Sequence, residues 1–334
     1  MSAGVLTIPC MPLWTESSTS NRSNGGCATA NVSTSLSPEL AALPCGFLVL
    51  DKPCGPTSHT CVNQVRRAYG LKKVGHGGTL DPAVSGVLPI ALGAATRLLP
   101  YLPGLKAYEG TIQLGLRTSS DDLEGEVLQR APVPVLTLER LENLLDRFRG
   151  THLQCPPQVS AVHVKGERAY ALARRGEVVH LEARSVTLHE LSLLNWNPVL
   201  GQISLRVRCS AGTYIRALAR DLGEHLGCGG ALAQLRRSEA LGFSLAQAVP
   251  LDSLNQDPRP PLLDPLLALP HLGRRQLTAA EELDWSCGRR LTAAANHLED
   301  EAVAVLNQEG RLAGIARAVA GDQLQPRLVF QAES

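Results

Sequence analysis

The chain has 334 residues, of which 44% are hydrophobic, and a formal net charge of +1. This length predicts one large domain or two, with enough apolar residues for a sizeable core. The near-neutral total means that a polyanionic partner has to be argued from local clusters of charge, not from net charge.

The nine cysteines are an odd number with no CxxC or CxxxC spacing, which argues against a disulfide framework and against a zinc site. Reduced cysteines are typical of a cytosol-like compartment, so we expect a cytoplasmic protein. No apolar run approaches the roughly 20 residues needed to cross a bilayer, and the N-terminus lacks the pattern of a secretory signal. A membrane association is therefore not expected.

Residues 1–44 are rich in Ser, Thr, Asn and Gly, and only Glu16, Arg22 and Glu39 are charged. The absence of a periodic apolar pattern predicts a disordered tail. A Ser-rich, acid-poor leader is also compatible with an organelle transit peptide, although the expected arginines are missing.

Apolar runs and helical spacing predict four elements before residue 102. Ser58 is the expected N-cap of the first helix and Gly70 its stop. The elements are a strand at 47–50, a helix at 58–69, a strand at 87–92 despite Pro89, and a short helix at 95–101.

The stretch GHGGTLDPAVSGVLPIALG at 75–93 holds one carboxylate, Asp81, which is the only acid between Lys52 and Tyr108. Residues 66–106 contain six Lys and Arg against that one acid, and six minus one gives +5. Asp81 before Pro82 can be an ordinary turn residue. The alternative is an active-site carboxylate to which a polyanion comes close, since the glycines allow tight turns and close approach.

From Tyr108 the apolar residues alternate, which predicts a strand over 108–116 with Tyr108 on its apolar face. Thr137 is the expected cap of a helix that Gly150 stops, and Gly212 precedes a helix that carries Arg216. The remaining predicted elements are a polar loop at 117–125, an irregular segment at 156–176, a strand at 203–209, a Pro-rich linker or wrapping segment at 251–270, and short strands at 302–306 and 312–315.

The sequence does not contain the residues that several common enzyme mechanisms require. A glycosidase needs a second carboxylate beside Asp81, a serine hydrolase needs GxSxG, and neither a Walker A nor a Rossmann motif is present. No metal-ligand cluster is visible. An enzyme with this sequence would use a single aspartate as nucleophile without a cofactor. A buried arginine would keep that aspartate ionised, and Arg216 is the best candidate by context, although composition alone would favour an ordinary surface arginine at this position.

The segments that carry this pattern resemble the TruB family of pseudouridine synthases, in order and in spacing, over residues 46–250. They are GFLVLDKPCGPTSH, GHGGTLDPAVSGVLPIALG, KAYEGTIQLG, PPQVSAVHVKGERAYALARRGEVV, CSAGTYIRALARDLGEHLG and GGALAQLRRS. The resemblance implies an α+β fold with a mixed, mainly antiparallel sheet, flanking helices and a central RNA-binding cleft. The C-terminal region resembles, more weakly, a small PUA-like β-rich domain. The resemblance implies a catalytic domain at 45–250, a linker at 251–271 and the PUA-like domain at 272–334, whereas the tail at 1–44, predicted from composition, has no counterpart in the family core.

The resemblance also implies roles for single residues. Asp81 matches the catalytic aspartate, Tyr108 the tyrosine that stacks on the flipped base, and Arg216 the arginine that pairs with the aspartate. The positions that the resemblance assigns to substrate binding or support of the site are His76, which packs into the RNA loop, Tyr214, Lys52, Pro53, Leu235 and the adjoining Arg236.

The implied reaction converts a uridine in the T-loop of transfer RNA, position 55, to pseudouridine without metal or cofactor. We expect a monomer that needs no protein partner. Two alternatives stay open: a catalytically idle RNA-binding or RNA-folding protein of the same fold, and a pseudouridine synthase with another RNA target, such as the guide-RNA-dependent relatives.

Overall fold

The computed structural model describes residues 44–164, 166–177, 179–293 and 298–330. The predicted disordered tail lies outside the described residues except for Pro44, so it stays a prediction. None of the described helices is long and apolar enough to cross a membrane.

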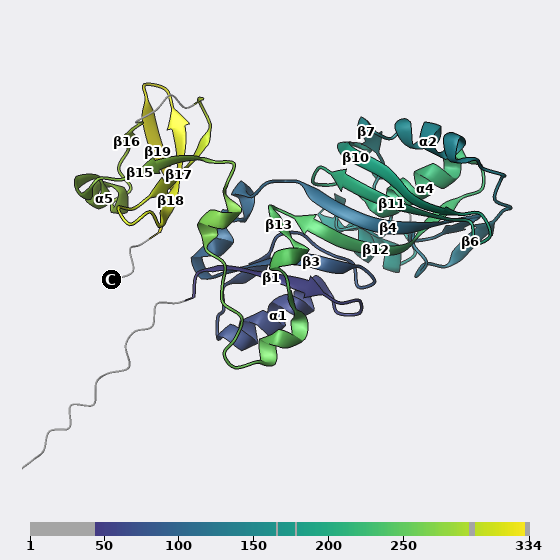
Figure 1. Ribbon diagram of the computed structural model, residues 1–334, viewed down its shortest axis with the longest axis horizontal. Helices are drawn as coiled ribbons and strands as arrows, with labels where there is room; N and C mark the ends of the chain where they lie inside the picture. Colours follow the sequence, from purple (N-terminus) through teal and green to yellow (C-terminus); the bar gives the residue numbers. More distant parts are fainter. Residues whose placement is uncertain (1–43, 165, 178, 294–297, 331–334) are drawn as a thin grey trace, which may run out of the picture. The chain divides into compact units, whose positions relative to one another are not determined.

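A mixed sheet of ten strands forms the centre of the larger domain (Figure 1). Its main path runs β14-β1-β3-β12-β4-β11-β10-β7, with β13 paired to β12 and β2 to β3. Within this sheet of the described residues, only the β1–β14 and β3–β12 pairs are parallel, so the predicted mixed, mainly antiparallel sheet is confirmed. The strands are β1 Gly46–Lys52, β2 Val74–His76, β3 Ser85–Leu92, β4 Lys106–Leu114, β7 Gly150–Gln154, β10 Arg184–Asn197, β11 Gln202–Cys209, β12 Gly230–Ala240, β13 Phe243–Ser244 and β14 Val249–Pro250.

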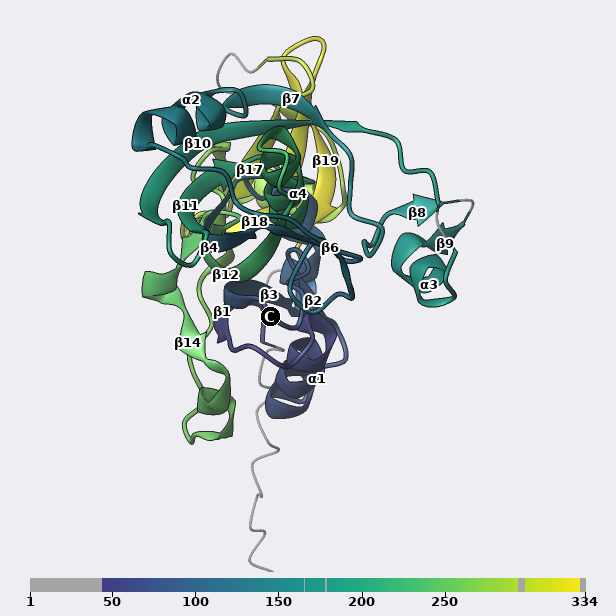
Figure 2. The same ribbon diagram turned by 90° about the vertical axis from the view of Figure 1, so that its right-hand side faces the viewer.

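Three helices pack against one face of this sheet in a single apolar core: α1 Ser58–Tyr69, α2 Leu138–Asp146 and α4 Ile215–His225. In both ribbon views α1 lies beside β1 and β3 (Figures 1 and 2). The other face, around β1 and β3, packs against a second cluster of apolar residues. The smaller elements are α3 Ala169–Arg174, the 3-10 helices η1 Gly93–Tyr101, η2 Leu245–Gln247, η3 Leu251–Asn255 and η4 Pro265–Ala268, and the two-stranded pairs β5 Leu116–Thr118 with β6 Val127–Arg130 and β8 His163–Val164 with β9 Glu167–Arg168.

The predicted ends of several elements need correction. The N-cap of α1 is Thr57, whose hydroxyl accepts from the Thr60 amide, while Ser58 is buried and bonds to Leu80 instead. The Gly70 stop is confirmed, since its left-handed φ of 64° ends the helix. The helix over 138–146 ends before Gly150, which begins β7.

The strand predicted over 108–116 ends at Leu114. Gly115 has φ of 87° and turns the chain, so Leu116 begins a separate hairpin, β5–β6, around the predicted polar loop. Strands β10 and β12 were not predicted from the alternation of apolar residues. Polar residues and register shifts interrupt the period of two in both strands.

Residues 251–271 follow the edge of the sheet. The amide of Phe47 donates to the Leu263 carbonyl (3.0 Å), and the Leu263 amide donates to the Phe47 carbonyl (2.7 Å). Two 3-10 helices, η3 and η4, lie in this segment. The segment therefore wraps against β1 and is not a free linker along this length.

The C-terminal domain has its own five-stranded sheet in the order β15-β17-β18-β19-β16 and its own apolar core around Trp285. The two short strands predicted here are confirmed, the second extending to Val319. The elements are β15 Gly273–Gln276, α5 Ala279–Ser286, β16 Leu291–Thr292, β17 Ala302–Leu306, β18 Leu312–Val319 and β19 Gln323–Val329.

Candidate active site

Asp81 lies in the loop between β2 and β3, where the parallel β3–β12 pair begins. At that point Arg237 of β12 is in register with Gly86 of β3. Gly86 has φ of 107°, and a Cβ there would collide with the backbone of Arg237. The close approach of the two strands therefore requires glycine and holds the loop against the centre of the sheet.

The predicted partner of Asp81 is in place. The Arg216 guanidinium lies 2.9 Å from Asp81 Oδ2. The Arg216 side chain is 8% exposed, whereas the Asp81 side chain is 43% exposed. The buried cation thus pairs with one side of the carboxylate, and its exposed side is free to meet a substrate.

Arg216 also joins two other loops to this site. It donates to the carbonyls of Ser120 and Val159, both at 2.9 Å. Its second carboxylate neighbour is Asp122, at 3.5 Å. Sequence analysis did not identify Asp122; the only signal was the acidic pair at 121–122 in a loop that was predicted merely as polar.

Lys52 is completely buried and supports the loop from the other side. Its ammonium donates to the carbonyls of Pro53 (2.8 Å), Pro56 (2.9 Å) and Pro82 (3.2 Å). Burial lowers the pKa of Lys52, which the nearby charge of Asp81 partly opposes. Because Pro82 follows Asp81 directly, Lys52 and the Pro53 carbonyl help to fix the position of the aspartate.

The hydroxyl of Ser58 fixes the residue on the other side of Asp81. It accepts from the Leu80 amide (2.8 Å) and lies 3.1 Å from the Leu80 carbonyl. The Asp81 carbonyl itself accepts from the Val84 amide (3.0 Å). The backbone on both sides of the carboxylate is thus hydrogen-bonded, which limits how far Asp81 can move.

Tyr108 is 6% exposed and lies on the face of β4 that carries the helices. Its predicted place on the apolar side is confirmed. Leu235 of β12 is in register with Gly110, and a Cβ at Gly110 would lie 2.9 Å from Leu235 Cδ1. Tyr108 and Leu235 therefore form adjoining parts of one apolar surface.

The structure does not bring Arg236 to this surface. Arg236 is exposed, is in register with the exposed Glu109, and pairs with Asp51 (2.7 Å). Successive side chains of a strand point to opposite faces, so Arg236 lies on the face away from Tyr108. Its predicted role in substrate binding is not supported by this position.

The next residue, Arg237, lies on the same face as Tyr108, and the sequence analysis had not assigned it a role. It is fully buried and in register with Tyr108. Its guanidinium donates to the carbonyls of Val87 (2.7 Å), Gly78 (3.2 Å) and Thr79 (3.4 Å). Burial raises the pKa of Tyr108, and the neighbouring charge of Arg237 partly opposes this rise.

Tyr214 precedes α4 and connects the site to the segment that follows β7. Its amide donates to Gln154 Oε1 (2.9 Å), and its carbonyl accepts from Gln154 Nε2 (3.1 Å). Its half-buried side chain packs against a small apolar cluster that includes Val162, Ala169 and Leu181. Tyr214 is thus two residues from Arg216 and in contact with a separate part of the chain.

Comparisons with known proteins show which family the chain belongs to. The N-terminal domain of TruB family pseudouridylate synthases matches residues 66–215, and the tRNA pseudouridylate synthase B C-terminal domain matches residues 216–266. The tRNA pseudouridine synthase B of Parasynechococcus marenigrum (strain WH8102) is 64% identical over 289 residues, which cover 86% of this chain and 98% of that protein. The chain belongs to the TruB family. The protein of the same name from Synechococcus sp. (strain WH7803) is 57% identical over 296 residues, with the same shares covered.

Solved structures share the TruB-type fold. A chain in the structure of an H/ACA RNP bound to a substrate RNA containing 2′-deoxyuridine has a TM-score of 0.67, with 24% identity over 86% of each chain. A chain in a Cbf5-Nop10-Gar1 complex has a TM-score of 0.65, with 24% identity over 86% of this chain and 84% of that one. At this identity the likeness concerns the fold, and the predicted pseudouridine synthase fold is confirmed.

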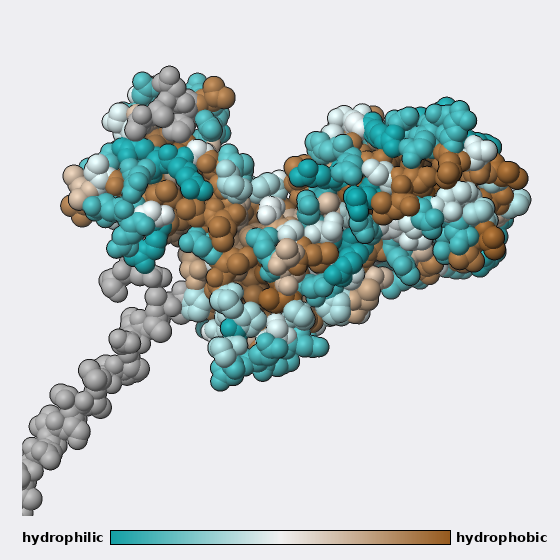
Figure 3. All heavy atoms as spheres, viewed as in Figure 1, coloured by the Kyte–Doolittle hydropathy of each residue, from teal (hydrophilic) through white to brown (hydrophobic). Residues whose placement is uncertain are grey.

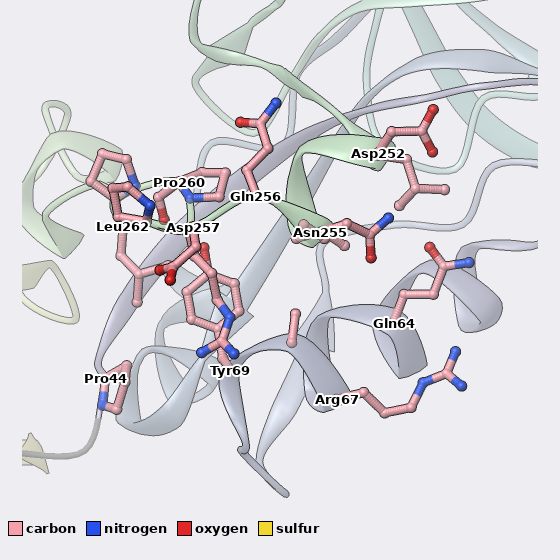
Figure 4. Close-up of a pocket in the computed structure, with 16 residues that line it drawn as sticks. Pro44, Gln64, Arg67, Tyr69, Asp252, Asn255, Gln256, Asp257, Pro260 and Leu262 are labelled. Atoms are coloured by element: carbon pink, nitrogen blue, oxygen red, sulfur yellow. Dashed lines mark hydrogen bonds between the residues drawn. The ribbon is translucent and has the colours of Figure 1, made fainter.

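A wide cavity of this TruB-family chain lies away from the candidate site. It has a volume of about 1010 Å³ and lies between α1 and residues 251–262. Figure 4 shows polar side chains such as Gln64, Asn255 and Gln256 around it. Asp81, Tyr108 and Arg216 do not line it, so we do not assign it to the same chemistry.

His76 ends β2, and its Nδ1 accepts from the Gly78 amide (3.2 Å). Burial, and next the charge of Arg237, lower its pKa below the ordinary 6.5. Below about pH 6.5 the unfolded chain therefore binds the proton more readily than the folded protein, and stability falls as the pH falls through the folded pKa. His76→Gln should lose less stability than the native chain between pH 7 and pH 5, as measured by urea unfolding.

The matched control for this prediction is His189→Gln, which changes an exposed histidine on β10. It should keep the pH dependence of the native chain. Identical pH profiles of the native chain and His76→Gln would show that His76 does not couple folding to pH.

Proposed function

We propose that this TruB-family chain isomerises uridine to pseudouridine in the T-loop of transfer RNA, at position 55, with Asp81 as the nucleophile. The observation that carries the proposal is the pairing of a half-exposed carboxylate with a buried guanidinium, in a loop whose backbone is held by buried cations. This arrangement holds one carboxylate in place beside an apolar surface and next to a cation.

The reaction rearranges bonds within one nucleotide. The bond from N1 to C1′ of the ribose breaks, a bond from C5 to the same C1′ forms, and a proton leaves C5 while one is taken up at N1. Ionised Asp81 can form its covalent bond either at C6 of the base or at C1′, and both routes begin from the same carboxylate. The base stays in the pocket between the two steps, so its surroundings have to hold it there.

A uridine within a folded loop has to leave its stack before it can reach Asp81, at a cost of a few kcal/mol. Stacking on an aromatic ring offsets this by roughly 1–3 kcal/mol. Tyr108 supplies that ring beside Leu235, His76 fills the opened RNA loop, and Tyr214 lines the pocket from the start of α4.

We further propose that the chain acts as a monomer without a protein partner and in the cytoplasm. On the face drawn in Figure 3, apolar residues form several patches separated by hydrophilic residues, rather than one broad surface. The presence of both Asp81 and Arg216 in an ion pair disfavours a catalytically idle protein of the same fold. An enzyme with another RNA target is the remaining alternative, and the following experiment distinguishes it.

The test is to incubate the purified chain, without added protein or guide RNA, with an unmodified T-stem-loop and to map pseudouridine at every position. We expect one product, at the T-loop uridine. An anticodon stem-loop and a T-stem-loop with cytidine at the target position are the controls and should give none. If other uridines are converted and the T-loop uridine is not, the proposed substrate is wrong. If no uridine in any RNA is converted, the proposed pseudouridine synthase activity is wrong.

Tyr108→Leu should lower turnover of the T-stem-loop by roughly 10- to 100-fold, because the flipped base loses a stacking energy of roughly 1–3 kcal/mol. RNA affinity should fall much less, since most contacts are to the backbone. Tyr108→Phe keeps the ring and should retain most of the stacking. Single-turnover rates and RNA dissociation constants separate the two effects, and a native rate for Tyr108→Leu would remove the stacking role.

A further inference from the structure

Lys106 is the first residue of β4, and its ammonium group makes no polar contact with any described residue that would explain its position in the free protein. Among the described residues it has neither a hydrogen-bond acceptor nor an ion-pair partner. The side chain is half-buried and lies on the same face of β4 as Tyr108 two residues later. Burial and the charge of Arg237 both lower the pKa of Lys106, so its charge is unfavourable where it stands.

Lys106 and Arg237 meet at Gly78. A Cβ at Gly78 would lie 3.4 Å from Lys106 Nζ and 3.9 Å from Arg237 Nη1. Gly78 has φ of 125°, a conformation that L side chains rarely adopt, so this position stays without a side chain. Two cations therefore border one open backbone position, three residues before Asp81.

No carboxylate compensates these charges. Within the described part of the chain, neither Lys106 nor Arg237 pairs with an acid, and Arg237 directs its N–H groups to backbone carbonyls. The donors of Lys106 remain uncommitted. A half-buried and a fully buried charge without a counter-ion are costly in the free protein, and a bound anion would relieve that cost.

The anion that an RNA substrate brings to this place is a phosphodiester. We propose that Lys106, with Arg237 behind it, forms an anion site at Gly78 that binds one backbone phosphate of the RNA strand beside the target nucleotide. This inference rests on the proposed function, because the ligand is the RNA that delivers its uridine to Asp81. The contact would fix the strand's position relative to the carboxylate without reading the base.

A double-mutant cycle with neutral linkages tests the site. T-stem-loops that each carry one methylphosphonate in place of a phosphodiester are bound to the full chain with Asp81→Asn, and dissociation constants are measured for each linkage near the target uridine. We expect one linkage at which neutralisation weakens binding about tenfold. Adding Lys106→Met should weaken binding of the native RNA by a similar factor. In that variant the methylphosphonate at that one linkage should cause no further loss of affinity, whereas the effects at the other linkages should be unchanged.

Two matched variants complete the design. Lys106→Arg keeps the charge and should keep the sensitivity of that linkage, and Lys73→Met removes an exposed lysine elsewhere and should leave it unchanged. Lys106→Met should also reduce the slope of log K against log salt by about 0.7, the value for one contact to a single strand. Melting temperatures show whether each variant is folded, and Lys106→Arg tests the charge even if Lys106→Met is unstable.

Additive losses at every linkage would overturn the anion site. This outcome is independent of the proposed function, because pseudouridine formation by the native chain is measured separately. Formation of product together with additive losses would leave the function standing and remove only the role of Lys106.

Discussion

Asp81→Asn should abolish pseudouridine formation, with a loss of at least roughly 10⁴-fold in turnover, which is the scale seen when a nucleophile is removed from an enzyme. The amide is nearly the same size as the carboxylate but cannot form the covalent bond. RNA affinity should stay within a few-fold of native, because backbone contacts supply most of it. Single-turnover assays and equilibrium binding with the same T-stem-loop measure the two quantities.

Asp51→Asn is the matched control for this substitution. Asp51 also ion-pairs with an arginine, Arg236, but on the face of the sheet away from Tyr108. It should change stability without removing turnover. Turnover by Asp81→Asn above about a hundredth of the native rate would contradict the nucleophile assignment, as would an equal loss in Asp51→Asn.

Much of the site could be predicted because its chemistry is local in sequence. The single carboxylate in a glycine-rich, basic stretch excluded two-carboxylate mechanisms. Arg216, 135 positions further along (216 minus 81), was the best candidate for its partner by context, and the resemblance implied the same pairing. The structure then places the two side chains 2.9 Å apart. Such a long-range pair follows from how the first turn of α4 lies beside the β2–β3 loop, which no pattern in a single segment encodes.

The two adjacent arginines of β12 differ in burial, and no sequence pattern predicts which of them is buried. Arg236 and Arg237 are chemically equal in the sequence, and only the register of β12 against β4 decides which one faces Tyr108. A shift of one residue would exchange their faces, and β12 contains two register shifts that no alternation of apolar residues reveals. The buried arginine thus became apparent only once the sheet was known.

The support of the Asp81 loop was foreseen only in part. Lys52 was expected to support it, yet that this lysine is fully buried and binds three carbonyls follows from the pairing of β1 with β3. Asp122 could not be assigned from sequence, because its role depends on the β5–β6 hairpin reaching Arg216. Both cases concern contacts of a loop with a distant strand or helix, about which hydrophobic periodicity carries no information.

Arg216→Met should lower turnover by roughly 10²- to 10³-fold, the scale for losing a charged group that stabilises a reacting one. The substitution leaves Asp81 without its buried partner and removes the donors to the Ser120 and Val159 carbonyls. Two unmade hydrogen bonds at roughly 1–3 kcal/mol each should also destabilise the fold by about 2–6 kcal/mol. Turnover per folded molecule, measured well below the melting temperature, separates the two effects.

Arg216→Lys and Arg220→Met show whether charge or geometry matters. A lysine keeps the positive charge but lacks the planar fork that reaches several acceptors, so its activity should lie between those of the native chain and Arg216→Met. Arg220, one turn later on α4, pairs with Asp121 (3.0 Å) and donates to the Cys155 carbonyl (2.8 Å). Arg220→Met should thus destabilise the same loops but keep the partner of Asp81, and its turnover per folded molecule should stay within a few-fold of native. Equal losses in Arg216→Met and Arg220→Met would show that the loops, and not the ion pair with Asp81, determine the rate.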